Sequence, residues 1–319
     1  MSSTLPAVDL PPQPWTGRFD GDGPEHRRWW QAVHPLDPPD GAAPRAGTTP
    51  VALLGFASDE GVRRNKGRTG AADAPAAIRR ALGPLAFHLD RTVSDAGDVV
   101  VDGGALEAGQ ERLGSLVTAL LDAGHLTVVL GGGHETAYAS YLGASASAAV
   151  RGGQRLGVLN LDAHFDLRDE AVPSSGTPFL QMARAEADAG RDFRYAVVGI
   201  SEPNNTPVLF DTADKLGVRY LLDEDCGADR VREFVADFLA DIDVLYLTID
   251  LDVLPAAVAP GVSAPAAYGV PLAVVSAVCR QVAQSGKLLH LDVAELNPVF
   301  DIDGRTARTA ARLLDTLLR

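Results

Sequence analysis

The sequence predicts one α/β domain in which helices cover both faces of a mostly parallel sheet, giving a doubly wound, three-layer arrangement. From Pro50 onward, short aliphatic runs alternate with longer stretches of helical periodicity. The aliphatic runs are nearly continuous, as expected for strands of a parallel sheet that is buried on both faces. A chain of 319 residues, 46% of them hydrophobic, is long enough to bury such a core.

The first 46 residues differ from the rest and predict an irregular N-terminal arm. Prolines occur throughout this segment, and proline interrupts the hydrogen bonding of helices and strands. Four aromatic residues are expected to anchor the arm on the body of the protein or on a neighbouring subunit: Trp15, Phe19, Trp29 and Trp30. A partly disordered tail is the alternative. We therefore divide the chain into an arm, residues 1–46, and one domain, residues 47–319.

Strands and helices are expected to alternate through this domain. Each expected strand is a short aliphatic run. The strands are Val51–Phe56, Thr127–Leu130, Leu156–Leu161, Tyr195–Ile200, Val218–Leu222, Val244–Ile249 and Leu288–Val293. Each expected helix is a stretch with helical spacing that lies between two such runs. The helices are Ala74–Leu82, Leu106–Ala123, Thr136–Ser147, Pro178–Ala189, Thr206–Leu216, Arg230–Ala240, Leu272–Gln284 and Thr306–Leu318.

The most informative motif follows the expected strand Leu156–Leu161. It sets Asp162, His164 and Asp166 at every second position. Side chains of an extended segment alternate between its two faces, so these three point the same way. Two carboxylates and an imidazole at a strand end suit a divalent metal ion, because buried ionised carboxylates are otherwise costly. A solvated loop with an incidental histidine is the alternative.

Two other strand ends carry similar side chains. Asp250 and Asp252 close the expected strand Val244–Ile249, again two positions apart. His134 follows three glycines, which allow a sharp turn and the close approach of a ligand. All these candidate ligands lie at the carboxyl ends of strands, which is where open α/β sheets bind ligands.

The number and type of these residues predict a two-metal centre. They are too many for one tetrahedral zinc site, and none is a thiolate. Carboxylate and imidazole donors suit Mn²⁺ best. Bridging carboxylates would hold two ions roughly 3.5–4 Å apart and activate one water molecule between them.

Composition and charge exclude several other classes of protein. The formal net charge of −14 argues against nucleic acid or an anionic membrane as a partner. No apolar run is long enough to span a bilayer, and the N-terminus lacks a signal-peptide pattern. Cys226 and Cys279 make no disulfide framework and are expected to be buried residues of a cytoplasmic protein. Because the charge argues against nucleic acid and membrane as partners, a small-molecule substrate is expected.

Together the motifs resemble the ureohydrolase family, the arginase and agmatinase group of binuclear manganese enzymes. The matching segments are Gly131–His134, Asp162–Asp166, Thr248–Asp252, Ala259–Pro265 and Glu295–Pro298. The resemblance implies an arginase-like fold, a homo-oligomer and two Mn²⁺ ions per chain. It implies that one ion is held by His134, Asp162, Asp166 and Asp250. It implies that the other is held by Asp162, His164, Asp250 and Asp252, so that Asp162 and Asp250 bridge.

Within this family the chain most resembles the formimidoylglutamase group. The segments that suggest it are Asp59–Gly70, Phe165–Arg168, Ser174–Phe179 and Pro255–Pro265. Arginases and agmatinases usually carry a histidine where Ser175 stands, so plain guanidine hydrolysis is less expected. The resemblance implies manganese-dependent hydrolysis of N-formimidoyl-L-glutamate to L-glutamate and formamide, a step of histidine degradation.

The chemistry of this substrate gives roles to further residues. Its amidinium group needs an anion to orient it, and Glu295 at a strand end can supply one. Its two carboxylates need cations, and a guanidinium binds a carboxylate through paired hydrogen bonds. An ordinary solvated loop is the alternative for the basic cluster 63–68. The expected substrate-binding residues are Arg63, Arg68, Arg168, Ser175 and, by resemblance, Asn204.

In the expected mechanism the two ions lower the pKa of a shared water, and Asp166 passes a proton to the departing glutamate nitrogen. The catalytic residues are therefore Asp166 and Glu295. Alternative activities are hydrolysis of a carboxylated guanidino compound such as guanidinobutyrate, or an agmatinase-like or arginase-like reaction. A metal-dependent deacylase and a catalytically silent metal-binding subunit are further alternatives.

Overall fold

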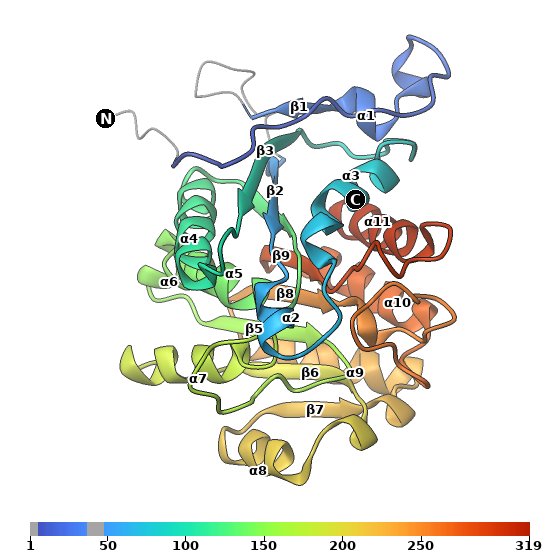
Figure 1. Cartoon of the computed structure of the whole chain (residues 1–319). Helices are drawn as coiled ribbons and strands as arrows, with labels where there is room; N and C mark the ends of the chain where they lie inside the picture. Colours follow the sequence, from blue (N-terminus) through green and yellow to red (C-terminus); the bar gives the residue numbers. More distant parts are fainter. Residues whose placement is uncertain (1–5, 37–47) are drawn as a thin grey trace.

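The computed structural model describes residues 6–36 and 48–319, which form a nine-stranded sheet with helices on both faces (Figure 1). Neighbouring strands are all parallel, in the order β1-β3-β2-β4-β9-β8-β5-β6-β7. The strands are β1 (Val33–Pro35), β2 (Val51–Ala57), β3 (Val93–Val100), β4 (Leu126–Leu130), β5 (Leu156–Leu161), β6 (Tyr195–Ile200), β7 (Arg219–Leu222), β8 (Val244–Asp250) and β9 (Leu288–Ala294). The predicted doubly wound, three-layer class is confirmed, and the sheet is wholly parallel.

The helices divide between the two faces of the sheet. They are α1 (Trp29–Ala32), α2 (Glu60–Arg64), α3 (Ala74–Leu82), α4 (Leu106–Asp122), α5 (Thr136–Ser145), α6 (Ala148–Arg151), α7 (Pro178–Asp188), α8 (Pro207–Lys215), α9 (Ala228–Ala240), α10 (Leu272–Gln284) and α11 (Arg305–Leu318). Short 3-10 turns occur at Pro24–His26, Ala71–Asp73, Glu202–Asn204, Asp223–Asp225 and Leu251–Val253. Helices α3, α9, α10 and α11 pack on one face, and α4, α5, α7 and α8 pack on the other (Figure 1).

The strands bury side chains on both faces, which explains their aliphatic sequences. In β2, Val51 and Leu53 point into the core beneath α3 and α11, whereas Leu54 and Phe56 point into the core beneath α4. All four are fully buried. Burial of such a side chain stabilises the fold by about 1.5–3 kcal/mol relative to leaving it exposed to solvent.

Most elements lie within one or two residues of their predicted bounds. The predicted helix Thr136–Ser147 corresponds to α5, which ends at Ser145, and the extended backbone of Ser147 separates α5 from a further helix, α6. Three helices and strands in the described part of the domain were not predicted: α2, which lies in an expected loop, α6 and β3. Strand β3 is polar, and its Asp95 and Asp98 are neutralised by Arg79 of α3, at 2.8 and 2.6 Å.

The N-terminal arm is more regular than predicted. Helix α1 and strand β1 lie within it, and β1 pairs with the edge of β3. Trp15 donates a hydrogen bond to Asp95 at 2.8 Å, and the buried Trp29 donates one to Asp315 at 3.1 Å. Phe19 is exposed and makes no such anchor. The predicted boundary between residues 46 and 47 lies outside the described residues.

Among the described residues, no helix combines the length and the apolar character needed to cross a membrane.

Candidate active site

The candidate metal ligands meet at the carboxyl ends of strands β4, β8 and β5. These strands and β9 are adjacent in the sheet, in the order β4-β9-β8-β5. His134 lies in the turn after β4, and Asp162 directly follows β5. Asp250 is the last residue of β8, and Asp252 lies in the 3-10 turn that follows. A parallel sheet thus gathers residues that are far apart in the sequence at one edge.

The turn that carries His134 depends on its glycines. A Cβ added to Gly132 would lie 1.8 Å from the carbonyl oxygen of Ser58, a distance no side chain can adopt. A Cβ on Gly131 would lie 2.9 Å from the carbonyl oxygen of Val293. The backbone N–H of His134 donates to Glu295 Oε1 at 2.8 Å. The turn is therefore packed against the ends of β2 and β9.

A first group of ligands surrounds one nitrogen of His134. Its Nδ1 lies 3.1 Å from Asp162 Oδ2, 2.9 Å from Asp166 Oδ2 and 3.2 Å from Asp250 Oδ2. The donor atoms of these four residues all lie within 4.8 Å of one another. Such spacing allows all four to contact one metal ion.

A second group shares Asp162 with the first. It consists of Asp162, His164 and Asp252, whose donor atoms again lie within 4.8 Å of one another. His164 Nδ1 is 3.0 Å from Asp252 Oδ2 and 3.6 Å from Asp162 Oδ1. The two oxygens of Asp162 therefore face different histidines, as a bridging carboxylate requires. Asp250 belongs only to the first group, and its Oδ1 accepts a hydrogen bond from the backbone N–H of Asp252 at 2.8 Å.

Hydrogen bonding places a proton on Nε2 of His134. The Thr248 hydroxyl donates its hydrogen to Asp292 Oδ1 at 2.6 Å. It can therefore only accept from His134 Nε2, which lies 3.1 Å away. Although burial lowers the pKa of His134, the carboxylates of Asp162, Asp166 and Asp250 raise it well above its usual range. Positive charge at Nδ1 is therefore favoured, supplied by a proton or by a metal ion that takes the proton's place. The donor set thus fits a metal ion.

The charge of the cluster leads to the same conclusion. Asp162, Asp250 and Asp252 are buried, and no lysine or arginine of the described residues pairs with them. Burial raises the pKa of Asp250 well above its usual range, and the charges of Asp252 and Asp162 raise it further. Burial also raises the pKa of Glu295, to about 8, with contributions from Glu135 and Asp252. The site is one where positive charge is stabilised.

Three residues at the cavity adopt left-handed backbone conformations that L-residues rarely occupy. The φ angles are 48° at Asp166, 68° at Glu295 and 61° at Lys66. Each of the three lines the same cavity. Backbone strain of this kind clusters at functional sites, where it directs side chains that regular elements could not present. No sequence pattern predicts these left-handed conformations.

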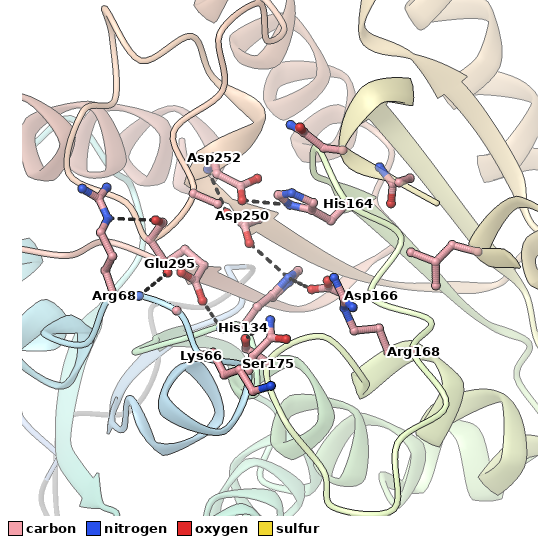
Figure 2. A pocket seen from close by; sticks show the side chains of 17 residues that line it. Lys66, Arg68, His134, His164, Asp166, Arg168, Ser175, Asp250, Asp252 and Glu295 are labelled. Atoms are coloured by element: carbon pink, nitrogen blue, oxygen red, sulfur yellow. Dashed lines mark hydrogen bonds and ion pairs between the residues drawn. The ribbon is translucent and has the colours of Figure 1, made fainter. Parts of the chain in front are cut away.

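A cavity lies beside the cluster, and Figure 2 shows the side chains that line it. Its volume is about 310 Å³. Its walls include His134, His164, Asp166, Asp250 and Asp252 from the cluster. The other lining residues that were predicted to bind substrate or act in catalysis are Arg68, Arg168, Ser175, Asn204 and Glu295. One cavity therefore joins the candidate metal ligands to most of the residues expected at the substrate.

Arg63, which was expected to bind substrate, does not line the cavity. Its guanidinium pairs with Glu60 at 2.6 Å, and its side chain is 64% exposed. Arg68 lines the cavity, but its guanidinium donates to the carbonyl oxygens of Val262 and Ser263 and lies over the ring of Phe300. These contacts attach the loop that carries Arg68 to the segment that contains Val262 and Ser263. They leave the guanidinium of Arg68 fewer N–H groups for a ligand.

Two cations remain for an anionic ligand. Lys66 and Arg168 line the cavity, and within the described part of the chain no carboxylate forms an ion pair with either. Lys66 lies in the basic cluster of the sequence, but nothing there distinguishes it from Arg63. Its backbone is left-handed and its side chain lines the cavity, and only the structure identifies it.

Comparison with known proteins identifies the family of the chain. The model of the Arginase family matches residues 49–319. A formimidoylglutamase from Rhodococcus jostii is 59% identical over 312 residues, which cover 97% of this chain and 96% of that protein. A formimidoylglutamase from Nocardia farcinica is 60% identical over 304 residues, covering 95% of each.

Solved structures share the fold. Formimidoylglutamase from Bacillus subtilis superposes with a TM-score of 0.78 at 22% identity, over 90% of this chain and 89% of that one. Formiminoglutamase from Trypanosoma cruzi, solved with Mn²⁺, superposes with a TM-score of 0.77 at 25% identity, over 85% and 92%. The match over residues 49–319, together with relatives that are more than half identical over nearly their whole length, shows that the chain belongs to the arginase family.

Proposed function

We propose that this protein hydrolyses N-formimidoyl-L-glutamate to L-glutamate and formamide, using two Mn²⁺ ions per chain. The observation that carries this proposal is the single cavity that joins the carboxylate–imidazole cluster to Lys66 and Arg168. A substrate with an amidinium at one end and two carboxylates at the other matches this distribution of charge. The names of the relatives from Rhodococcus jostii and Nocardia farcinica support the same substrate.

The carboxylate and imidazole donors, with no thiolate among them, suit Mn²⁺. One ion would be held by His134, Asp162, Asp166 and Asp250. The other would be held by Asp162, His164 and Asp252, with Asp250 as the further ligand expected from the family resemblance. When bound, such ions lower the pKa of a water molecule and so supply the nucleophile at neutral pH.

The residues of the chain orient the substrate and move the proton. Glu295 accepts from the His134 backbone through Oε1 and faces the cavity, where its carboxylate orients the amidinium. Lys66 and Arg168 bind the two carboxylates. Asp166 is 13% exposed, more than the other carboxylates of its group, and it delivers a proton to the departing glutamate nitrogen. Ser175 and Asn204 complete the wall around the substrate.

A panel of substrates tests the proposal. Protein purified and loaded with Mn²⁺ is incubated with formimidoylglutamate, guanidinobutyrate, agmatine and arginine, and the release of formamide, glutamate and urea is measured. We expect formamide and glutamate in equal amounts from the first compound and little urea from the others. Urea from a guanidino compound, without formamide, would replace the proposal by a guanidino-acid hydrolase.

The cellular setting follows from the same proposal. Formimidoylglutamate hydrolysis would place the enzyme in histidine degradation. We also propose that the enzyme works in the cytoplasm and, from the family resemblance, that it is a homo-oligomer. The buried, unpaired thiols of Cys226 and Cys279 are compatible with a reducing compartment. Light scattering of the Mn²⁺-loaded protein tests the oligomer, and a monomeric mass would contradict it.

A further inference from the structure

Glu135 follows the candidate ligand His134 and forms a link to the wall of the cavity. Its side chain is fully buried, and its Oε1 accepts hydrogen bonds from Ser58 Oγ at 2.7 Å and from the Gly61 backbone N–H at 2.9 Å. Both donors belong to the segment 58–70, which lies between β2 and α3 and carries Lys66. Glu135 thus connects the turn after β4 to this segment.

The contact between the two segments is tight enough to require glycine. A Cβ on Gly61 would lie 2.6 Å from the Cβ and Cδ atoms of Glu135. A Cβ on Gly133 would lie 2.2 Å from Glu135 Oε2 and 2.3 Å from Val62 Cγ2. In addition, the Gly133 N–H donates to the Ser58 carbonyl at 3.0 Å. Helix α2 is therefore docked directly on the turn that holds His134.

A short chain of hydrogen bonds leads from Glu135 to the tip of the segment. The Gly61 carbonyl accepts from the Asn65 N–H at 2.9 Å. The next residue, Lys66, has its N–H bonded to the Arg63 carbonyl at 3.1 Å. The side-chain amide of Asn65 donates to Ser175 Oγ at 3.1 Å, across the cavity wall. The position of Lys66 therefore depends on how α2 is seated on Glu135.

Other residues hold the far end of the segment. The Arg68 N–H donates to Ser263 Oγ at 3.0 Å. The Asn297 side chain donates to the carbonyl oxygens of Arg68 and Thr69, at 2.9 and 3.0 Å. With this end fixed, Glu135 is the buried side chain that fixes the beginning. A segment held at both ends presents its lysine in a preorganised position, which reduces the entropic cost of binding.

We propose that Glu135 is a positioning residue for substrate recognition, which seats α2 so that the Lys66 ammonium meets a substrate carboxylate. Glu135 itself does not line the cavity. This inference rests on the proposed function, because it needs a substrate with a carboxylate for Lys66 to bind.

A double-mutant cycle tests the link. Glu135→Ala should raise KM for formimidoylglutamate about tenfold, with kcat and Mn²⁺ content changed less than about twofold. Glu135→Gln keeps an acceptor oxygen and should restore most of the affinity. In a Lys66→Met background, Glu135→Ala should add less than about twofold, because the contact it supports is already absent. Independent, multiplying effects on KM would overturn the proposal.

Glu107→Ala is the matched control. Glu107 also contacts α2, through Arg64 at 2.6 Å, but its side chain is 52% exposed and lies outside the cavity. Its removal should leave KM within about twofold of the wild type, as expected for an exposed ion pair. A KM increase as large as that of Glu135→Ala would mean that any loosening of α2 suffices, and would overturn a specific role for Glu135.

Hydrogen exchange gives a readout that does not depend on the reaction. In Mn²⁺-loaded protein without substrate, amides of residues 60–68 should exchange faster in Glu135→Ala than in the wild type, with other regions unchanged. Unchanged exchange would contradict the link even if KM rises. If the wild type releases no formamide, the proposed function fails, whereas the exchange result still decides whether Glu135 holds the segment.

Discussion

Residues outside the candidate metal centre orient its ligands, and His134 is the clearest case. Its Nε2 is bound by Thr248, whose hydroxyl in turn donates to Asp292. Strand register explains the arrangement, because Thr248 and Asp292 are directly paired on β8 and β9. A buried network of this kind selects one tautomer and one ring orientation.

Thr248→Val should therefore weaken Mn²⁺ binding about 10- to 100-fold, since outer partners of metal ligands have effects of that size. Titration of metal-free protein with Mn²⁺ measures it. Thr127→Val is the control, because Thr127 makes the comparable contact with His290 on neighbouring strands. Equal loss of Mn²⁺ affinity in both variants would argue against a specific role for Thr248.

Arg168 should matter only for carboxylated substrates. Arg168→Met removes a cavity cation and should raise KM for formimidoylglutamate at least about tenfold. For a formimidoyl amine without carboxylates the increase should stay below about twofold, because the guanidinium then has no partner. Steady-state kinetics with both compounds distinguishes this outcome from a general loss of activity.

His290 makes stability depend on pH. It is fully buried in β9, and burial lowers its pKa to about 3. In the unfolded chain the pKa is about 6.5, so between these values the unfolded state binds a proton that the folded state does not. The free energy of unfolding therefore falls as pH drops below about 6.5, by at most about 1.4 kcal/mol per pH unit.

His290→Asn should flatten this dependence relative to the wild type by about one proton. Urea unfolding at pH 7, 6 and 5 measures it, with His88→Asn, at an exposed position, as the control. Parallel curves for wild type and His290→Asn would contradict the assignment.

Among the elements, the aliphatic strands could be predicted from sequence and β3 could not. Strand β5 was predicted with its observed bounds, because a run of buried residues is visible locally. In β3, the buried Asp95 is tolerated because Arg79 and Trp15 supply donors from distant parts of the chain. Such partners exist only in the folded protein.

The same distinction separates the metal ligands from the substrate residues. Asp162 and Asp250 could be identified because each lies at the end of a recognisable strand. The choice between Arg63 and Lys66 could not be made, since it depends on a single left-handed residue and on the docking of α2. Helix α2 has only five residues, too few for a periodic pattern.

Arg79 should stabilise strand β3, which lies next to the edge strand β1. Arg79→Met leaves Asp95 buried without its cation and should lower the free energy of unfolding by about 3–5 kcal/mol. Adding Asp95→Asn should recover part of this loss, because the uncompensated charge is removed. Urea unfolding of the single and double variants measures both effects, and no recovery would contradict the electrostatic explanation.

At the scale of the whole molecule, the sequence predicts the layered parallel fold, and membership of the arginase family agrees with it. What it could not predict is the course of the arm, where β1 extends the sheet beside β3. That strand has three residues and ends in proline, so its own sequence does not predict a strand. It is extended because it pairs with β3 in the folded protein.

The wide separation of the site residues along the chain has a thermodynamic consequence. The backbone N–H of His134 bonds to the side chain of Glu295, which lies 161 positions away in the sequence. In the unfolded polypeptide such residues are far apart, so they form no comparable binding site for a cation. Mn²⁺ should therefore act as a folding ligand by mass action, adding about 2.7 kcal/mol per site at a free concentration one hundred times the dissociation constant. Calorimetric melting temperatures should climb with free Mn²⁺ and drop on chelation; a melting temperature indifferent to Mn²⁺ would contradict this coupling.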